Sequence, residues 1–156
     1  MDTGVRALET YKMHIGGKWV DSASGETFET YDPYTAQPWA LIPRGNKQDV
    51  DRAVEAAHQA FTTGDWPEIN ATQRGAMLRK LGDLLSEHAD HLAEIEVRDN
   101  GKLIAEMSAQ CKYLPQWYHY YGGLADKIEG SVIPIDKPGH FNYTLWEPLG
   151  VVAAIT

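Results

Sequence analysis

The segment that decides the predicted fold class reads Pro148-Leu149-Gly150-Val151-Val152-Ala153-Ala154-Ile155-Thr156. Residues 151–155 are apolar without alternation, which is typical of a strand that is buried on both faces in a parallel sheet. A parallel strand needs a neighbour that is reached by a crossover connection of about a dozen residues or more. No such connection follows residue 156 in this sequence. We therefore expect an α/β protein in which residues 151–156 form the first strand of an incomplete doubly wound sheet.

The first third of the chain predicts a small antiparallel sheet. Gly16-Gly17 has the two-residue glycine spacing of a tight hairpin. Pro38 and Pro43 flank another short strand, and proline favours an edge or a short element because it donates no N–H. The expected strands are 13–15, 18–20, 27–31 and 39–42.

Three helices are expected in the middle of the chain. Asn46 with Asp49 and Asn70 with Gln73 have the spacing at which a helix cap and its third residue bond each other. The apolar stripe of the second helix weakens over residues 86–90, which predicts a break there, and Asn100-Gly101 ends it. A third helix has Pro115 in its first turn and ends at Gly130.

Two further strands, 131–135 and 141–147, are predicted around a Lys137-Pro138-Gly139 turn. Together with residues 151–155 they would expose apolar side chains and unpaired backbone groups if no further sheet covered them. Such strands favour edge-to-edge pairing, so we expect self-association through residues 131–156.

Composition excludes several classes of protein. The net charge is −8, which argues against nucleic acid or an anionic membrane as the main partner. No apolar run approaches the roughly 18 residues of a membrane-spanning helix, and residues 1–11 have no secretory signal. The single cysteine, Cys111, excludes an internal disulfide and suits a reducing compartment, so we expect a cytoplasmic protein.

Single reactive residues make a weak case for catalysis. Cys111 and His119 would lie about 12 Å apart along a helix, too far for a thiolate–imidazole pair. His88 and His91 could share a helix face, but a third zinc ligand is not evident. An aromatic cluster could stack a cofactor, although packing between helices or subunits is the commoner role. Its members are Tyr113, Trp117, Tyr118, Tyr120 and Tyr121.

Asp99 is more informative, because it continues the apolar stripe formed by Leu92 and Ile95. A carboxylate that points inward needs several N–H donors or a cation as its partner. Donors from the turn after the helix are one reading, and a cation shared with backbone carbonyls is the other.

Five motifs in order resemble the N-terminal part of NAD(P)-dependent aldehyde dehydrogenases, and the resemblance covers residues 11–156. They occupy residues 14–20, 24–33, 96–102, 120–127 and 147–152. The family's chains are far longer. By this resemblance, residues 1–130 are the hairpin and helices of the cofactor-binding domain, residues 131–150 are an oligomerisation β-element, and residues 151–156 are the first strand of a truncated Rossmann-like sheet.

The resemblance also implies a reaction and its sites. In the family a thiolate attacks the aldehyde, a hydride passes to NAD or NADP, and water releases a carboxylic acid. The nucleophilic cysteine, the general base, the oxyanion asparagine and the cofactor glycine turn would all fall beyond residue 156, and Cys111 does not match the nucleophile. The resemblance places Thr156 at the cofactor site. It also implies a monovalent cation held by the backbone carbonyls of Thr30 and Tyr31 and by Asp99.

We therefore expect the N-terminal portion of an aldehyde-oxidising enzyme that forms a homo-oligomer, either a dimer or a tetramer. The segment alone has no predicted catalytic residue and is expected to be inactive. The alternative is a non-catalytic interaction module, or one half of a split dehydrogenase. The aldehyde and the choice between NAD and NADP stay open at this point.

Overall fold

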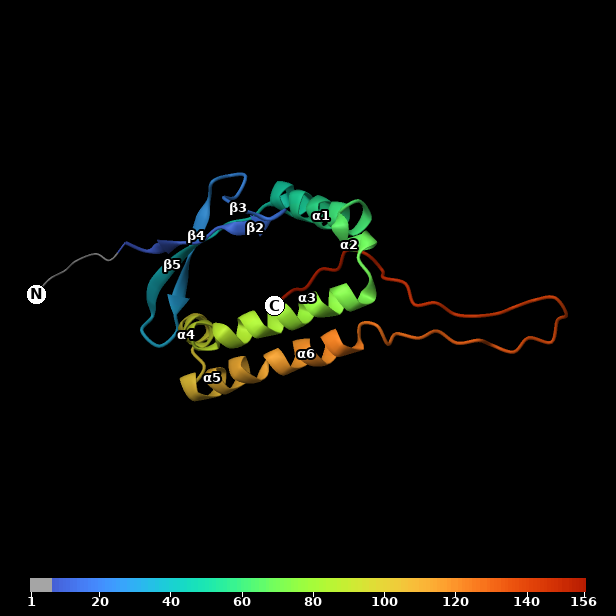
Figure 1. Cartoon of the computed structure of the whole chain (residues 1–156). Coiled ribbons are helices and arrows are strands. Elements are labelled where there is room, and N and C mark those ends of the chain that lie inside the picture. Colours follow the sequence, from blue (N-terminus) through green and yellow to red (C-terminus); the bar gives the residue numbers. More distant parts are fainter. Residues whose placement is uncertain (1–6) are drawn as a thin grey trace, which may run out of the picture.

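The computed structural model describes residues 7–156, which form two layers and a long extended segment (Figure 1). The strands and the first helix make one layer, and the last four helices make the other. The strands are β1 (Glu9–Thr10), β2 (Met13–Ile15), β3 (Lys18–Val20), β4 (Thr27–Asp32) and β5 (Gln37–Pro43). The helices are α1 (Lys47–Thr62), α2 (Asp65–Glu68), α3 (Ala71–Glu87), α4 (Ala89–Asn100), α5 (Ile104–Tyr113) and α6 (Pro115–Leu124).

The expected hairpin forms between β2 and β3. Gly16 and Gly17 have φ angles of 59° and 76°, which a residue with a side chain adopts only at a cost. Both positive angles belong to the hairpin turn whose twist matches that of the two strands. Met13 pairs with Val20, and Ile15 pairs with Lys18. The glycine pair therefore sets the register that the sequence predicts.

The position of β5 corrects an expectation. It is the central strand of a three-stranded sheet in the order β1–β5–β4, not an edge strand, and β1 pairs with it in parallel. The two prolines are tolerated for local reasons. Pro38 lies beside a shift in the β4–β5 register between Thr30 and Tyr31, and Pro43 is the last residue of β5. Ala40 and Leu41, which lie between them, pair with both neighbouring strands. The sheet is consequently mixed, not wholly antiparallel.

Both predicted helix caps are present. The Asn46 side chain accepts from the N–H groups of Gln48 and Asp49, and the Asp49 carboxylate accepts from the Asn46 N–H. Asn70 and Gln73 make the equivalent reciprocal pair at the start of α3. The predicted break lies at His88, which separates α3 from α4. These local signals satisfy N–H groups that a helix otherwise leaves without partners.

The third predicted helix is α6, which has Pro115 in its first turn as expected but ends at Leu124, not near Gly130. A further helix, α5, precedes it and was not predicted. Leu114 keeps helical angles, but Pro115 has no N–H to donate to the carbonyl four residues earlier. The ladder is therefore interrupted at that point, and two helices follow one another.

The helix layer depends on glycine. The α3–α6 contact is the most extensive between two elements of the described chain. A Cβ on Gly122 would lie 2.8 Å from the Gly75 carbonyl oxygen, and one on Gly82 would lie 2.6 Å from the His119 ring. The Arg79 guanidinium donates to the Gly122 carbonyl oxygen at 2.8 Å across the same seam. Two backbones can approach this closely only where neither carries a side chain.

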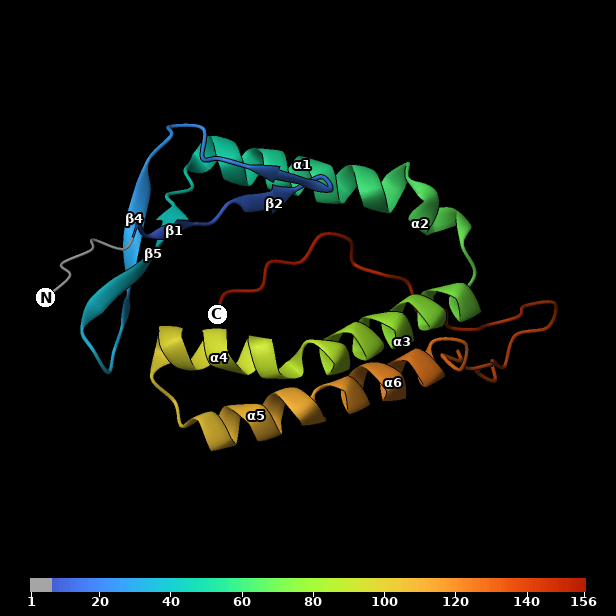
Figure 2. The ribbon, with the colours of Figure 1, turned by 60° about the vertical axis from the view of Figure 1, so that its left-hand side comes forward.

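The segment after α6 departs most from the expectation. Residues 131–147 run out and back as an extended pair (Figures 1 and 2), yet only one bridge, between Val132 and Tyr143, joins the two halves. Residues 151–156 form no strand, and Ile155 is 96% exposed. The predicted buried strand is therefore wrong for this structure, because no strand among residues 7–156 lies beside it to pair with. In both views residues 151–156, at the red end of the chain, run between α1 and α3.

Few side chains are fully buried in the described chain. The buried apolar residues are Ala40, Ala89, Ala93 and Met107, whereas large apolar side chains are exposed on α1, α3 and α6. The largest fully buried side chain is that of Asp49. None of the helices within residues 7–156 has both the length and the apolar character that crossing a bilayer requires.

The buried Asp49 carboxylate connects the β layer to α1. It accepts from the Ala23 N–H at 3.0 and 3.1 Å and from the Asn46 N–H at 3.1 Å, and Arg52 lies 3.4 Å away. A single side chain therefore fixes the loop between β3 and β4 against the start of the helix.

We predict that Asp49→Ala lowers the free energy of unfolding by about 2–3 kcal/mol, because two N–H groups lose a charged acceptor. The measurement is urea unfolding followed by circular dichroism. Asp51→Ala is the matched control. It removes only an exposed pair with Lys47, so its cost should stay below about 0.5 kcal/mol. Equal losses of unfolding free energy in the two variants would show that the buried Asp49 carboxylate stabilises the fold no more than an exposed one.

Candidate functional site

The structure brings two of the candidate cation ligands into direct contact. Thr30 lies on β4 and Asp99 in the last turn of α4, and the Thr30 hydroxyl donates to Asp99 Oδ1 at 2.7 Å. Asp99 is exposed, so the expectation of an inward carboxylate is wrong. Its partner is also not an N–H of the following turn. The N–H of Lys102 bonds to Asn100 Oδ1 instead.

The pairing of β4 with β5 beside this contact is irregular. Thr30 pairs with Ala40 and Tyr31 with Pro38, so Trp39 is the extra residue of a bulge. Because Pro38 has no N–H, the strand opposite Tyr31 lacks one donor of the ladder. A bulge of this kind turns carbonyl oxygens out of the regular pattern. Carbonyls without a ladder donor and an adjacent carboxylate are the oxygen ligands that a hard cation takes.

The Tyr31 side chain makes a hydrogen bond of its own, which does not involve the Tyr31 backbone carbonyl. Its hydroxyl donates to Glu29 Oε2 at 2.5 Å, and this hydrogen bond raises the pKa of Tyr31 above its ordinary value. The nearby Glu29 charge acts in the same direction. The phenol therefore stays protonated and occupied with Glu29, so only the Tyr31 backbone is a candidate ligand.

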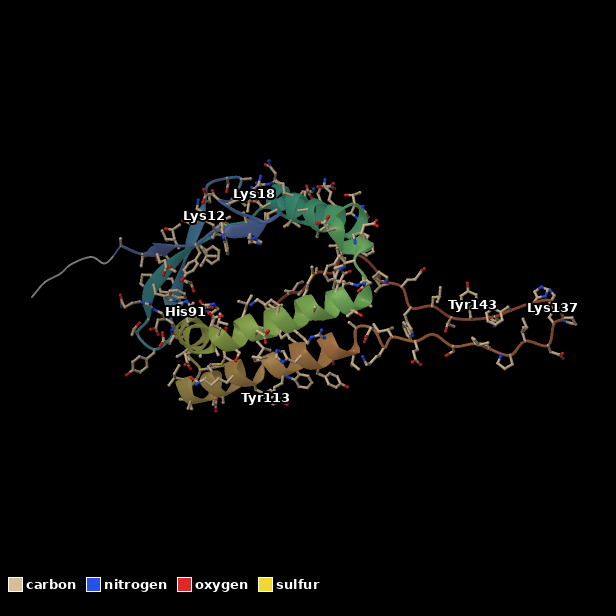
Figure 3. The ribbon with its side chains drawn as sticks, in the orientation of Figure 1. Lys12, Lys18, His91, Tyr113, Lys137 and Tyr143 are labelled. Atoms are coloured by element: carbon tan, nitrogen blue, oxygen red, sulfur yellow. The ribbon has the colours of Figure 1, made fainter. Side chains whose placement is uncertain are left out.

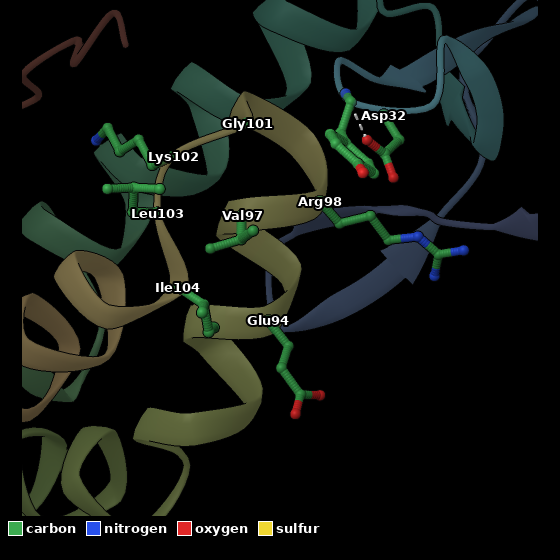
Figure 4. A pocket seen from close by; sticks show the side chains of 9 residues that line it. Asp32, Glu94, Val97, Arg98, Gly101, Lys102, Leu103 and Ile104 are labelled. Carbon is green, nitrogen blue, oxygen red and sulfur yellow. Dashed lines mark hydrogen bonds between the residues drawn. The ribbon is translucent and has the colours of Figure 1, made fainter.

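A pocket of about 460 Å³ lies on the other side of the same α4 turn. Figure 4 shows its lining, in which Arg98 and Lys102 point in different directions. Its aliphatic members are Val97, Leu103 and Ile104. Asp32 closes one end, where its carboxylate accepts from the Tyr34 N–H at 2.8 Å. No local motif in the sequence marks this pocket, because its walls come from segments about 70 residues apart.

Thr156, the candidate cofactor residue, is exposed at the end of the extended segment. The described residues contain no glycine-rich turn between a strand and a helix that would hold a pyrophosphate. Gly122 and Gly123 lie inside α6, as the sequence predicted. Residues 7–156 therefore do not by themselves fit a dinucleotide.

The other candidate residues do not form a catalytic group. His119 lies on α6 and its Nε2 contacts Asp83 Oδ1 at 3.0 Å, whereas Cys111 lies half-buried on α5. His88 separates α3 from α4, and His91 is exposed on α4. Within residues 7–156, no three His, Cys, Asp or Glu side chains gather in a metal-binding cluster.

The aromatic cluster lies on α5 and α6. Trp117, Tyr118 and Tyr121 line a pocket of about 260 Å³ together with Leu78 and Leu114. Tyr113 stacks edge-on against Trp117 with ring centroids 6.0 Å apart. Figure 3 places Tyr113 on the side of the helix layer away from the strands. The cluster is an exposed apolar face with no basic residue in its lining.

Comparisons with known proteins identify the family to which this chain belongs. A profile of the aldehyde dehydrogenase family matches residues 19–156. The chain belongs to the aldehyde dehydrogenase family.

Individual members of the family are similar over nearly the whole chain. The (Z)-2-((N-methylformamido)methylene)-5-hydroxybutyrolactone dehydrogenase of Acinetobacter baylyi is 45% identical over 148 residues, which are 95% of this chain and 30% of that protein. The mitochondrial aldehyde dehydrogenase family 2 member B4 of Arabidopsis thaliana is 42% identical and covers 90% of this chain and 26% of that protein.

Solved aldehyde dehydrogenase structures have the same arrangement of elements. The NAD⁺ complex of the Bacillus cereus enzyme has a TM-score of 0.85 at 39% identity, over 90% of this chain and 29% of that one. A betaine aldehyde dehydrogenase from Staphylococcus aureus with NAD⁺ has a TM-score of 0.77 at 35% identity, over 81% of this chain and 26% of that one. The chain thus spans about a third or less of the length of the family members that it matches.

A cation on this site would stabilise the fold. We predict that potassium or sodium chloride raises the unfolding free energy relative to tetramethylammonium chloride at equal ionic strength. At ten times the dissociation constant the gain is about 1.4 kcal/mol. Asp99→Asn should remove the gain, and thermal unfolding by calorimetry measures it.

The control is Asp90→Asn, which alters an exposed carboxylate on the same helix that pairs with Lys112. It should leave the cation response unchanged. A response of equal size in Asp99→Asn and the unaltered chain would contradict a site at Asp99.

Proposed function

We propose that the protein of which this chain forms the matched part oxidises an aldehyde to a carboxylic acid with NAD or NADP. The observation that carries the proposal is the family match over residues 19–156 together with the structural likeness over 90% of the chain. Several of the similar structures hold NAD⁺, including the Bacillus cereus and Staphylococcus aureus complexes described above. The cofactor would accept a hydride, and the residues present here would supply the frame around it.

Within that frame, each part of the chain has a proposed task. Residues 1–130 belong to the cofactor-binding domain, residues 131–150 form the oligomerisation element, and residues 151–156 lead into the cofactor site with Thr156 at its edge. Thr30, Tyr31 and Asp99 would hold a monovalent cation where β4 meets α4. The hydrogen bond from Thr30 to Asp99, which joins β4 to α4, supports this proposal because it brings two of the three residues together.

A second candidate function is one half of a split dehydrogenase, or a module that binds another protein. The exposed apolar side chains favour it. Leu149 is fully exposed, Trp146 is 78% exposed, and the apolar faces of α1 and α3 are also uncovered. A homo-oligomer built through residues 131–150 is the partner that the family resemblance implies.

We predict that the purified 156-residue chain reduces neither NAD nor NADP with acetaldehyde, benzaldehyde or betaine aldehyde. By the family resemblance it has no cysteine in the nucleophile position, and Cys111 is half-buried on α5. The absorbance of reduced nicotinamide measures turnover. Turnover that persists through purification and is lost in Cys111→Ala, but not in a matched Ser108→Ala variant, would contradict the assignment.

We also predict self-association through residues 131–156. Light scattering over a dilution series should show assemblies larger than a monomer, and removal of residues 131–156 should reduce them. The paired substitution Val132→Lys with Tyr143→Lys should do the same, because it charges both sides of the one bridge. Lys137→Ala at the turn is the control. A monomer at every concentration, with or without the tail, would contradict this prediction.

A further inference from the structure

One side-chain amide in this chain is chemically labile. The sequence has four asparagines, and Asn100 is the one that a glycine follows. In such a pair the backbone nitrogen of the glycine attacks the side-chain carbonyl carbon of asparagine. A carbon–nitrogen bond forms, ammonia leaves with the broken amide bond, and a five-membered succinimide results. Water then opens the ring to aspartate or isoaspartate. Glycine permits this reaction best because it has no side chain to hinder the attack.

The end of α4 holds every reacting group in place. Asn100 Nδ2 donates to Glu96 Oε1 at 2.9 Å, and Asn100 Oδ1 accepts from the Lys102 N–H at 2.9 Å. The nucleophile itself, the Gly101 nitrogen, donates its hydrogen to the Val97 carbonyl at 2.8 Å. Attack requires that hydrogen to leave and the bond to the carbonyl to break. It also requires rotation about the backbone of Asn100, which α4 keeps helical.

The β layer covers the turn at Asn100 and Gly101 from outside. Gly101 has a φ of 76° as the left-handed residue after the helix, and a Cβ there would lie 3.1 Å from Pro33 Cβ. Pro33 directly follows β4, and Thr30 of β4 donates to Asp99 one residue before Asn100. The turn at 100–101 can therefore loosen freely only when β4 moves away from α4.

We propose that Asn100 is a deamidation site whose reaction is suppressed by the contact between β4 and α4. The folded chain reacts slowly because the reactive geometry is reached only through local opening. Once the contact opens, Asn100 converts to aspartate or isoaspartate. This inference does not depend on the enzymatic function proposed above.

The product would alter the site that it lies beside. A carboxylate at position 100 adds negative charge next to Asp99 and opposite Glu96, at the helix end where the dipole already disfavours negative charge. Isoaspartate also lengthens the backbone by one carbon, which displaces the Gly101 N–H from the Val97 carbonyl. Deamidation would therefore prevent the helix end from regaining its original form.

The experiment follows deamidation of the intact chain in mildly alkaline buffer, with and without urea. Peptide mapping by mass spectrometry locates the loss of ammonia and gain of water, and enzymatic isoaspartyl methylation counts the isoaspartate. Asn100 should be the fastest of the four asparagines in urea. In the folded chain it should react at least about tenfold more slowly, the suppression that an opening cost of about 1.4 kcal/mol gives. Asn46, Asn70 and Asn142 are internal references.

Two variants separate this mechanism from general destabilisation. Thr30→Val keeps the side-chain shape but removes the hydroxyl that bonds to Asp99, and Glu96→Ala removes the acceptor of Asn100 Nδ2. Each should speed the reaction at Asn100 in the folded chain and leave the rate in urea unchanged. Thr27→Val, at the far end of β4, is the matched control and should have no effect. Circular dichroism shows whether each variant is folded.

Three outcomes would overturn the proposal. Equal rates at Asn100 with and without urea would show that the fold does not suppress the reaction. A faster reaction at another asparagine in urea would show that Asn100 is not the labile site. A folded Thr30→Val chain that reacts at the unaltered rate would show that the β4–α4 contact does not control it.

Discussion

The hydrogen bond from Thr30 to Asp99 is the constraint on which the arrangement at one end of the molecule depends. It joins β4 to the last turn of α4, and Pro33 packs on Gly101 beside it. The bond is exposed, so its own contribution to stability is modest. Its effect is geometric. It positions the irregular part of the β4–β5 ladder against a carboxylate, and it holds β4 beside the turn at 100–101.

Each layer has its own source of stability. In the β layer the buried Asp49 carboxylate satisfies N–H groups of both the β3–β4 loop and the start of α1. In the helix layer Gly75 and Gly122 allow α3 and α6 to approach closely, and Arg79 bonds across the seam. Neither source needs a large apolar core, and the described chain has few buried apolar side chains. Hydrogen bonds to the backbone and close packing of small residues therefore supply much of the stability of the two layers.

The features that the sequence predicted correctly are local ones. The Gly16-Gly17 turn, the caps at Asn46 and Asn70, and the break at His88 each depend on residues within a few positions of one another. The failures are non-local. The central position of β5 depends on its pairing with β1, which starts some 30 residues earlier. Pro38 is tolerated in β5 because it lies beside the bulge in the β4–β5 ladder. Likewise, the exposure of Asp99 depends on how β4 lies against α4, which the stripe of Leu92 and Ile95 cannot indicate.

The candidate site residues differ in whether the elements that position them are present within the described chain. Thr30, Tyr31 and Asp99 lie on two elements that are both folded here, so the contact between them is present within residues 7–156. Thr156 lies in a segment whose apolar sequence is suited to a parallel strand, but a strand exists only when a neighbour supplies the other half of each hydrogen bond. Segment 151–156 has no such neighbour in the described chain and stays extended and exposed. The cation proposal can therefore be tested on this chain alone, whereas a cofactor role for Thr156 requires the strands that would pair beside it.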